Sequence, residues 1–75
     1  MPELKVSPSV MITVNGESVK IREGETLLEL LEAQGFRLGV IAVEHNGKVI
    51  KRDAYGTITL QQGDKLEVVS FVGGG

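Results

Sequence analysis

Alternating apolar and polar residues near the start of the chain predict two strands joined by a tight turn. In the stretch VMITVNGESVKIRE, apolar side chains occupy every second position on both sides of Asn15-Gly16. A two-residue period is typical of strands that bury one face. Asn-Gly favours the type I′ turn, in which both central residues take a positive φ. We therefore expect a β-hairpin centred on this dipeptide.

The pattern becomes helical in the next stretch, GETLLELLEAQG. Its four leucines form one broad apolar face, and its glutamates lie elsewhere around the helix. Thr26, followed three residues later by Glu29, is a capping-box signature, and Gly35 is suited to end a helix in the left-handed conformation. The stretch predicts one main helix over about residues 26–34.

The second half of the chain returns to strand patterns. GVIAVEHNGKVIKR contains a second Asn-Gly pair and predicts a second hairpin. RDAYG predicts an irregular turn or a short 3₁₀ segment, TITL a short strand, and LEVVSFV a final strand after a turn at Gly63-Asp64. A helix that crosses between two hairpins covers one face of a mixed sheet, which is a two-layer α+β architecture. The β-grasp roll has this order of elements, with four or five strands.

Alternation also divides the side chains of the final strand between two faces. We expect Leu66 and Val68 to face the helix, which leaves Val69 and Phe71 on the open face of the sheet. If the leader or a neighbouring strand covers them, their role is structural. If they are exposed, they form an apolar patch for a partner, and we favour this interpretation. The other expected core residues are Val14, Ile21, Leu27, Leu28, Leu31, Val43 and Leu60.

Composition narrows the class of protein. The chain has 75 residues, 41% of them hydrophobic, and a net charge of −2, which is typical of one small globular domain. It has no cysteine, so disulfides and a catalytic thiol are excluded. The sequence lacks a long apolar run, a signal-peptide pattern and a cluster of Lys and Arg. We therefore expect a cytoplasmic protein with no membrane or nucleic-acid partner.

The sequence suggests no active site of its own. His45 adjoins the second Asn-Gly turn, where we expect a solvated surface histidine rather than a general base, because no nucleophile is evident beside it. Glu25, Glu29 and Glu32 are expected to form a solvated helix face rather than a metal site. Two glycine-rich patterns that bind phosphate groups, Gly-x-Gly-x-x-Gly and the P-loop, are both absent from the sequence. The expectation is a protein that is not an enzyme and that has no cofactor or metal.

The chain ends in three glycines, Gly73 to Gly75, directly after the final strand. Because glycine has no side chain and takes backbone angles closed to other residues, such a tail could enter a channel too narrow for any Cβ atom. It would present the terminal carboxylate, a competent nucleophile toward an activated phosphate, to the active site of another protein. The alternative is a frayed end, because terminal disorder is common.

Four segments of the sequence carry a family resemblance: VNGE, VEHNGKVIKR, GDKLEVVSFV and the terminal glycines. With them the chain closely resembles the thiamine-pathway sulfur carrier (ThiS) family from about Met11 to Gly75. The resemblance implies a ubiquitin-like β-grasp fold. It also implies that a ubiquitin-activating-like adenylyltransferase, with its own ATP and Mg²⁺, adenylates the carboxylate of Gly75. A cysteine desulfurase relay then supplies the sulfur of a thiocarboxylate, and thiazole synthase accepts that sulfur.

The patterns and the resemblance divide the chain into three parts. Residues 1–10 are a leader, which is either flexible or extends the first strand, and Met11 could itself be an alternative start. Residues 11–72 form the β-grasp domain, and residues 73–75 form a flexible tail.

The resemblance also assigns the expected functional residues. Gly75 is the site of adenylation and thiocarboxylate formation, and Gly73 and Gly74 accompany it into the partner's active site. Docking to the partner is expected to use Val69, Phe71 and Val72.

Other functions share this fold and ending. The carriers of molybdopterin synthesis, tRNA thiolation and cysteine synthesis have both, so the fold alone does not separate the pathways. The short chain and the SFVGGG ending favour the thiamine carrier. The alternative from another class is a plain β-grasp protein-interaction module whose glycines begin a linker.

Overall fold

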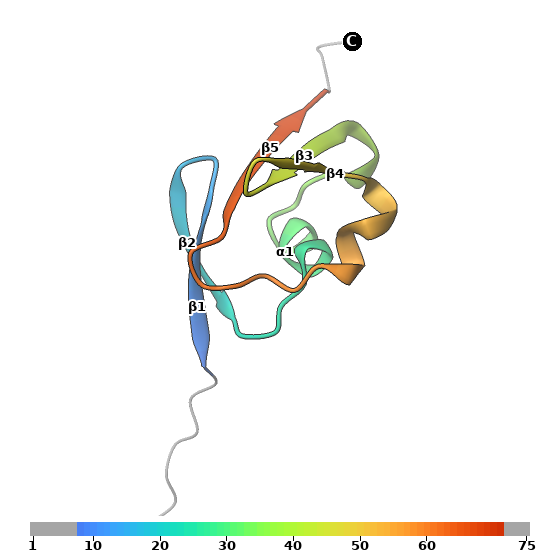
Figure 1. Ribbon diagram of the computed structural model, residues 1–75. Coiled ribbons are helices and arrows are strands. Elements are labelled where there is room, and N and C mark those ends of the chain that lie inside the picture. The colour runs from blue at the N-terminus through green and yellow to red at the C-terminus, as the bar shows by residue number, and fades with distance from the viewer. Residues whose placement is uncertain (1–7, 72–75) are drawn as a thin grey trace, which may run out of the picture.

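Two hairpins and one later strand form a five-stranded mixed sheet in the computed structural model, which describes residues 8–71 (Figure 1). Its strands are β1 (Ser9–Val14), β2 (Glu17–Arg22), β3 (Ile41–His45), β4 (Lys48–Ile50) and β5 (Lys65–Ser70). They are ordered β2-β1-β5-β3-β4, with β1 parallel to β5 and the other neighbours antiparallel. The last strand therefore lies at the centre and joins the two hairpins.

Both Asn-Gly turns have the backbone geometry that the sequence predicts. Asn15 and Asn46 each have a φ of 51°, and the glycines that follow them have φ values of 85° and 86°. A positive φ at both central positions is the mark of the type I′ turn, whose twist matches that of the flanking strands. The antiparallel registers on either side confirm the two hairpins.

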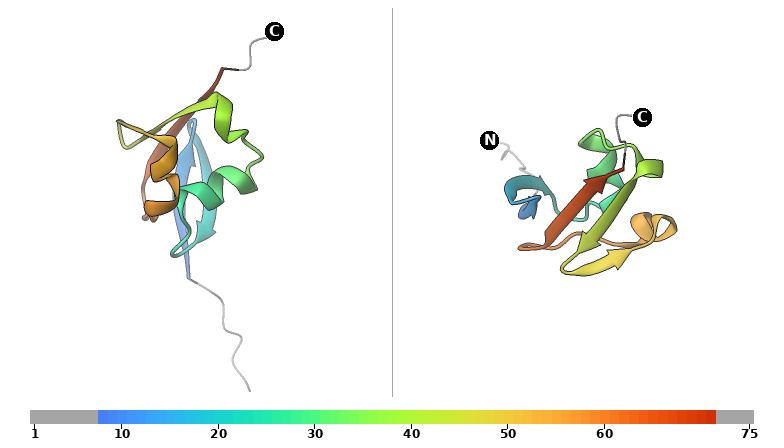
Figure 2. Two further views of the ribbon diagram at one scale, coloured as in Figure 1. Left: turned by 90° about the vertical axis from the view of Figure 1, so that its right-hand side faces the viewer. Right: turned by 90° about the horizontal axis from the view of Figure 1, so that it is seen from above.

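The helix α1 (Leu27–Ala33) also forms as predicted and packs across one face of the sheet (Figure 2). At its start, Thr26 Oγ1 accepts the Glu29 N–H at 3.1 Å, and Glu29 Oε1 accepts the Thr26 N–H at 2.9 Å. This reciprocal pair is the predicted capping box. Gly35 follows the helix with a φ of 83°, which confirms its left-handed conformation.

Two short 3₁₀ segments, η1 (Leu38–Val40) and η2 (Arg52–Thr57), complete the fold. The second confirms the irregular segment predicted at RDAYG. The strand predicted at TITL is wrong, because only an isolated bridge between Thr26 and Thr59 forms there. Leu27 donates its N–H to the Ile58 carbonyl at 2.9 Å, and the chain then turns into α1. The pairing therefore ends after one bridge.

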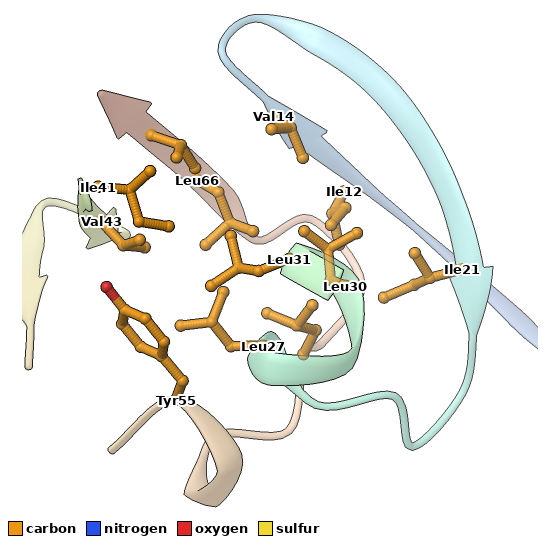
Figure 3. Close-up of a cluster of buried hydrophobic side chains, with 12 residues drawn as sticks. Ile12, Val14, Ile21, Leu27, Leu30, Leu31, Ile41, Val43, Tyr55 and Leu66 are labelled. Atoms are coloured by element: carbon orange, nitrogen blue, oxygen red, sulfur yellow. The ribbon is translucent and has the colours of Figure 1, made fainter. Parts of the chain in front are cut away.

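The hydrophobic core lies between the sheet, α1 and η2 (Figure 3). Every predicted core residue is buried except Leu28, which is only partly buried and lies against Gly56 of η2. Leu30 on the same helix is buried instead. Tyr55 is also buried, because η2 places its ring against the inner face of the sheet. The full core consists of Ile12, Val14, Ile21, Leu27, Leu30, Leu31, Ile41, Val43, Tyr55, Leu60, Leu66 and Val68.

The strand β1 begins at Ser9, so the last two residues of the expected leader belong to it. The predictions of a flexible leader before residue 8 and of a flexible tail at residues 73–75 lie outside the described residues, and they stay predictions. Within residues 8–71, no helix has both the length and the apolar character needed to cross a membrane.

Candidate functional site

The central strand β5 exposes the two apolar residues that the sequence places on its open face. Val69 is 58% exposed and Phe71, just after the strand, is 64% exposed, whereas Leu66 and Val68 are buried under α1. The predicted alternation and the predicted exposure are both confirmed. Val72 and the three glycines lie outside the described residues, so their expected roles stay predictions.

The register of the sheet extends this apolar surface beyond β5. Val69 pairs with Ala42 on β3, and Val49 on β4 is exposed on the same face. We call this group, Ala42, Val49, Val69 and Phe71, the outer-face patch. It lies on the side of the sheet away from α1, and it includes Phe71, the last described residue.

A main-chain hydrogen bond fixes the point at which β5 ends. The N–H of Phe71 donates to the carbonyl of Val40 in η1 at 2.6 Å. Because Phe71 is the last described residue, this bond holds the described end of the chain against the neighbouring segment. The described part of the chain therefore ends at a fixed position at one end of the sheet (Figure 1).

The asparagines of both hairpin turns hold β5 from its two sides. Asn15 Oδ1 accepts the Val68 N–H at 2.7 Å, and its Nδ2 donates to the Val68 carbonyl at 3.1 Å. On the other side, Asn46 Oδ1 accepts the Lys65 N–H at 2.8 Å. Since β1 pairs with β5 at only two positions, Asn15 lengthens a short ladder.

Sequence reasoning treated these asparagines only as turn residues. A turn of this type also accepts Asp or Gly at the first position, but of these three residues only Asn has a side chain that both donates and accepts at neutral pH. The presence of Asn in both turns was therefore the available sequence signal for these side-chain hydrogen bonds to β5.

His45 is not the solvated residue that the sequence predicts. Its Nε2 lies 2.8 Å from Asp64 Oδ2, and the two side chains are only 21% and 10% exposed. Asp64 also accepts the Gln61 N–H at 2.8 Å and an N–H of Asn46 at 3.0 Å. The prediction was wrong because the turn before β5 folds against the second hairpin and covers the ring.

The environment of Asp64 has two opposing effects on its pKa. Burial disfavours the charged form and by itself would raise the pKa. The hydrogen bonds from His45, from the Gln61 N–H and from Asn46 favour the carboxylate, and they hold the pKa below its ordinary value of 3.8. The cluster therefore contains an ionised aspartate that ties the second hairpin to the start of β5.

The described residues contain no grouping of side chains typical of a metal site. Within residues 8–71, no three His, Asp or Glu side chains lie close enough together to hold a metal ion. A mainly apolar groove of about 360 Å³ lies between β2 and α1, with Val19, Ile21, Leu30 and Ala33 among its lining residues. It holds no histidine and lies apart from the end of β5. The outer-face patch is therefore the candidate site.

The arrangement of elements defines the class of protein. A first hairpin, a crossing helix, a second hairpin and a central last strand parallel to the first make a ubiquitin-like β-grasp domain. Comparison with known proteins gives the family. The model described as the ThiS family matches residues 10–75. The chain belongs to the ThiS family.

Individual relatives agree with this assignment. A thiazole synthase of Magnetococcus marinus is 45% identical over 64 residues, which are 85% of this chain. The sulfur carrier protein ThiS of Bacillus subtilis is 33% identical over 66 residues, which cover 87% of this chain and 100% of that relative. The chain spans only 20% of the length of the Magnetococcus protein.

A solved structure supports the fold directly. The crystal structure of the thiamine biosynthesis protein (ThiS) from Geobacter metallireducens has a TM-score of 0.74 and 35% sequence identity to this chain. The similarity covers 88% of this chain and 100% of that one. The β-grasp fold predicted from the sequence is confirmed.

Proposed function

We propose that this chain is a sulfur carrier protein of thiamine biosynthesis, whose Gly75 carboxylate is adenylated and then converted to a thiocarboxylate. The observation that carries this proposal is a match along the whole length of a relative named as a sulfur carrier. The family match also runs through the terminal glycines to residue 75. The chain is then a substrate of its partner enzymes and not itself an enzyme.

The chemistry requires a free carboxylate on the carrier, and the partners supply the rest. A carboxylate oxygen of Gly75 attacks the α-phosphate of ATP, and pyrophosphate leaves. The ATP and Mg²⁺ are held by a ubiquitin-activating-like adenylyltransferase. The persulfide sulfur of a cysteine desulfurase relay then attacks the activated carbonyl carbon, and AMP leaves. A thiol cleaves the resulting acyl disulfide, which releases the thiocarboxylate and leaves the other two sulfurs as a disulfide. This division of labour suits a domain whose terminal residues carry no functional side chain.

The folded part of the chain contributes recognition, and the glycines contribute reach. Three extended residues span at most about 10 Å, which is enough to cross a short channel while the domain stays outside. The exposed residues Val69 and Phe71 lie next to the start of this tail, so a partner that binds them is well placed to receive it. We propose that Val72 joins them in docking.

The relatives named thiazole synthase support thiazole synthase as the acceptor of the sulfur. A segment similar to this chain forms part of each of those longer proteins. This favours the thiamine pathway over the carriers of molybdopterin synthesis, tRNA thiolation and cysteine synthesis. The partners named above and the thiamine pathway together favour a cytoplasmic location.

Intact mass spectrometry tests the proposed function. The chain is produced together with a cysteine desulfurase and the cognate adenylyltransferase, and its mass is compared with that of the chain produced alone. We expect a gain equal to the replacement of one oxygen by sulfur, located at Gly75. A variant with one residue added after Gly75 is the matched control and should show no gain. An unchanged mass for the wild-type chain would support the interaction-module alternative.

A further inference from the structure

Two glutamates are paired across neighbouring strands on the outer face of the sheet. Glu44 on β3 pairs directly with Glu67 on β5 in the antiparallel register. Their neighbours Val43 and Val68 are buried against α1, so alternation places both glutamates on the opposite side. Residues paired in this way have Cβ atoms about 4.5–5.5 Å apart. Two negatively charged side chains therefore leave the sheet from neighbouring positions on its outer face.

No ion pair within residues 8–71 joins a cation to either of these glutamates. Among the described residues, Arg22 forms an ion pair with Glu25, and His45 contacts Asp64. No hydrogen bond within residues 8–71 reaches the side chain of Glu44 or Glu67. Lys65 lies on the same face of β5 but forms no ion pair with Glu67. Like charges directly opposite each other destabilise a sheet, so the isolated chain carries an unfavourable interaction.

Exposed apolar residues frame the two carboxylates. Val49 pairs with Glu44 from the β4 side and is 72% exposed. Val69 is the next residue on the outer face of β5 after Glu67, and it is also exposed. A partner that covers the outer-face patch therefore removes both carboxylates from water. Burying a charge without a counter-charge is costly, so a partner that binds here needs a cation at this place.

We propose that an arginine of the adenylating partner binds between Glu44 and Glu67, and that apolar residues of the same partner contact Val69 and Phe71. This inference rests on the proposed function for the identity of the partner. Arginine fits better than lysine, because its planar guanidinium has five N–H donors and can bind both carboxylates at once. The same contact removes the repulsion that the free chain carries. Docking at this point also aligns β5, and with it the start of the tail.

A binding titration against the purified adenylyltransferase tests the arginine contact. Glu44→Gln and Glu67→Gln keep the size of each side chain and remove its charge. Each should weaken binding by about fivefold to tenfold and reduce its dependence on salt. Glu32→Gln, on the exposed side of α1, makes the same change in net charge away from the patch and should bind as the wild-type chain does.

Thermal unfolding of the free variants is a second measurement. In it the same substitutions should be favourable, because they should raise stability while they weaken binding. Glu44→Gln and Glu67→Gln should each raise the unfolding midpoint by about 1–5 °C, because one repulsive charge is gone. A purely structural role would lower the midpoint. The expected result is therefore a chain that is more stable and binds less tightly.

The outcomes separate this inference from the proposed function. Equal affinity and equal salt dependence for wild type and both variants, with the wild-type chain thiocarboxylated, would overturn the arginine contact alone. A lowered midpoint in both variants would also overturn it. A wild-type chain that neither binds the adenylyltransferase nor gains sulfur would overturn the proposed function and this contact together.

Discussion

Val68 and Val69 are adjacent and chemically identical, yet they lie on opposite faces of the sheet. Val68 is buried beneath α1, and Val69 is exposed on the outer-face patch. The inner face of β5 is fixed by packing within the chain, whereas nothing in residues 8–71 covers the outer one to the same degree. An apolar residue on this strand is thus either buried in the core or exposed, and its position in the alternation decides which; we propose that the exposed residues contact a partner.

The largest effect, a loss of adenylation, is expected from changes at the terminal glycines, which follow β5 in the sequence. Adding one residue after Gly75 converts its carboxylate to an amide, and Gly74→Val would place a branched side chain in the narrow channel that we propose in the partner. We expect both changes to abolish adenylation in an ATP–pyrophosphate exchange assay with the cognate adenylyltransferase. The thermal midpoint should move little. Undiminished exchange would exclude a role for the terminal carboxylate.

The next largest effect is expected in the core that supports the inner face. Leu31 is fully buried on α1, so Leu31→Ala should cost about 2–5 kcal/mol through lost contacts and a cavity. Since small domains have a total stability of roughly 5–15 kcal/mol, a large share of the population could unfold. Urea denaturation followed by circular dichroism measures this. A loss below that range would mean that the core closes around the smaller side chain.

A substitution on the outer face should weaken binding to the partner and leave the fold intact. Phe71→Asp replaces an exposed ring with a charge, and we expect affinity for the adenylyltransferase to fall by about a hundredfold, as for an interface anchor. Circular dichroism should show an unchanged fold. If the domain unfolds instead, Phe71 belongs functionally to the core, and the comparison between the two faces fails at this position.

The two valines allow a matched test of the comparison itself. Val68→Ala should destabilise the domain by about 2 kcal/mol, because two buried methyl groups are lost. Val69→Ala should change stability by less than about 0.5 kcal/mol. Denaturant midpoints of the two variants, measured side by side, give the difference. Equal losses would show that the outer face is covered within the free chain.

The smallest effect concerns the cluster at the start of β5. The pKa of Asp64 is lower in the folded chain than its ordinary value of 3.8, so its ionised form stabilises the fold. This contribution is present above about pH 4 and is lost as pH falls through the folded pKa. Asp64→Asn should therefore reduce the loss of stability between neutral and acid pH. Thermal midpoints across that range test the sign, and an unchanged acid dependence would contradict it.

Local signals in the sequence account for most of the fold. The two Asn-Gly turns, the Thr26–Glu29 capping box and the alternation in β5 depend on residues close together in the chain, and all of them were predicted. The TITL segment failed because its pairing is decided by the entry into α1 and not by its own β-propensity. Tyr55 was missed because a short 3₁₀ segment gives no periodic pattern from which burial can be inferred.

The contacts around β5 were beyond sequence reasoning for a different reason. Asn15 reaches Val68 across 53 residues, and His45 reaches Asp64 across 19. No local pattern connects such positions, and only the strand order brings them together. The exposure of Val69 and Phe71 was predictable because it needs only alternation and one covered face. The pairing of Glu44 with Glu67 needs the register, which only the structure provides.

The central place of β5 also has a mechanical consequence. A partner that draws the terminal glycines into a channel, as proposed above, would pull along the axis of this strand. The strand is bonded on one side to β1 and Asn15, and on the other to β3 and Asn46. A force along the strand loads these bonds together in shear instead of opening them one after another. A domain whose last strand is bonded on both sides should resist a pull along that strand better than one whose last strand lies at the edge of the sheet.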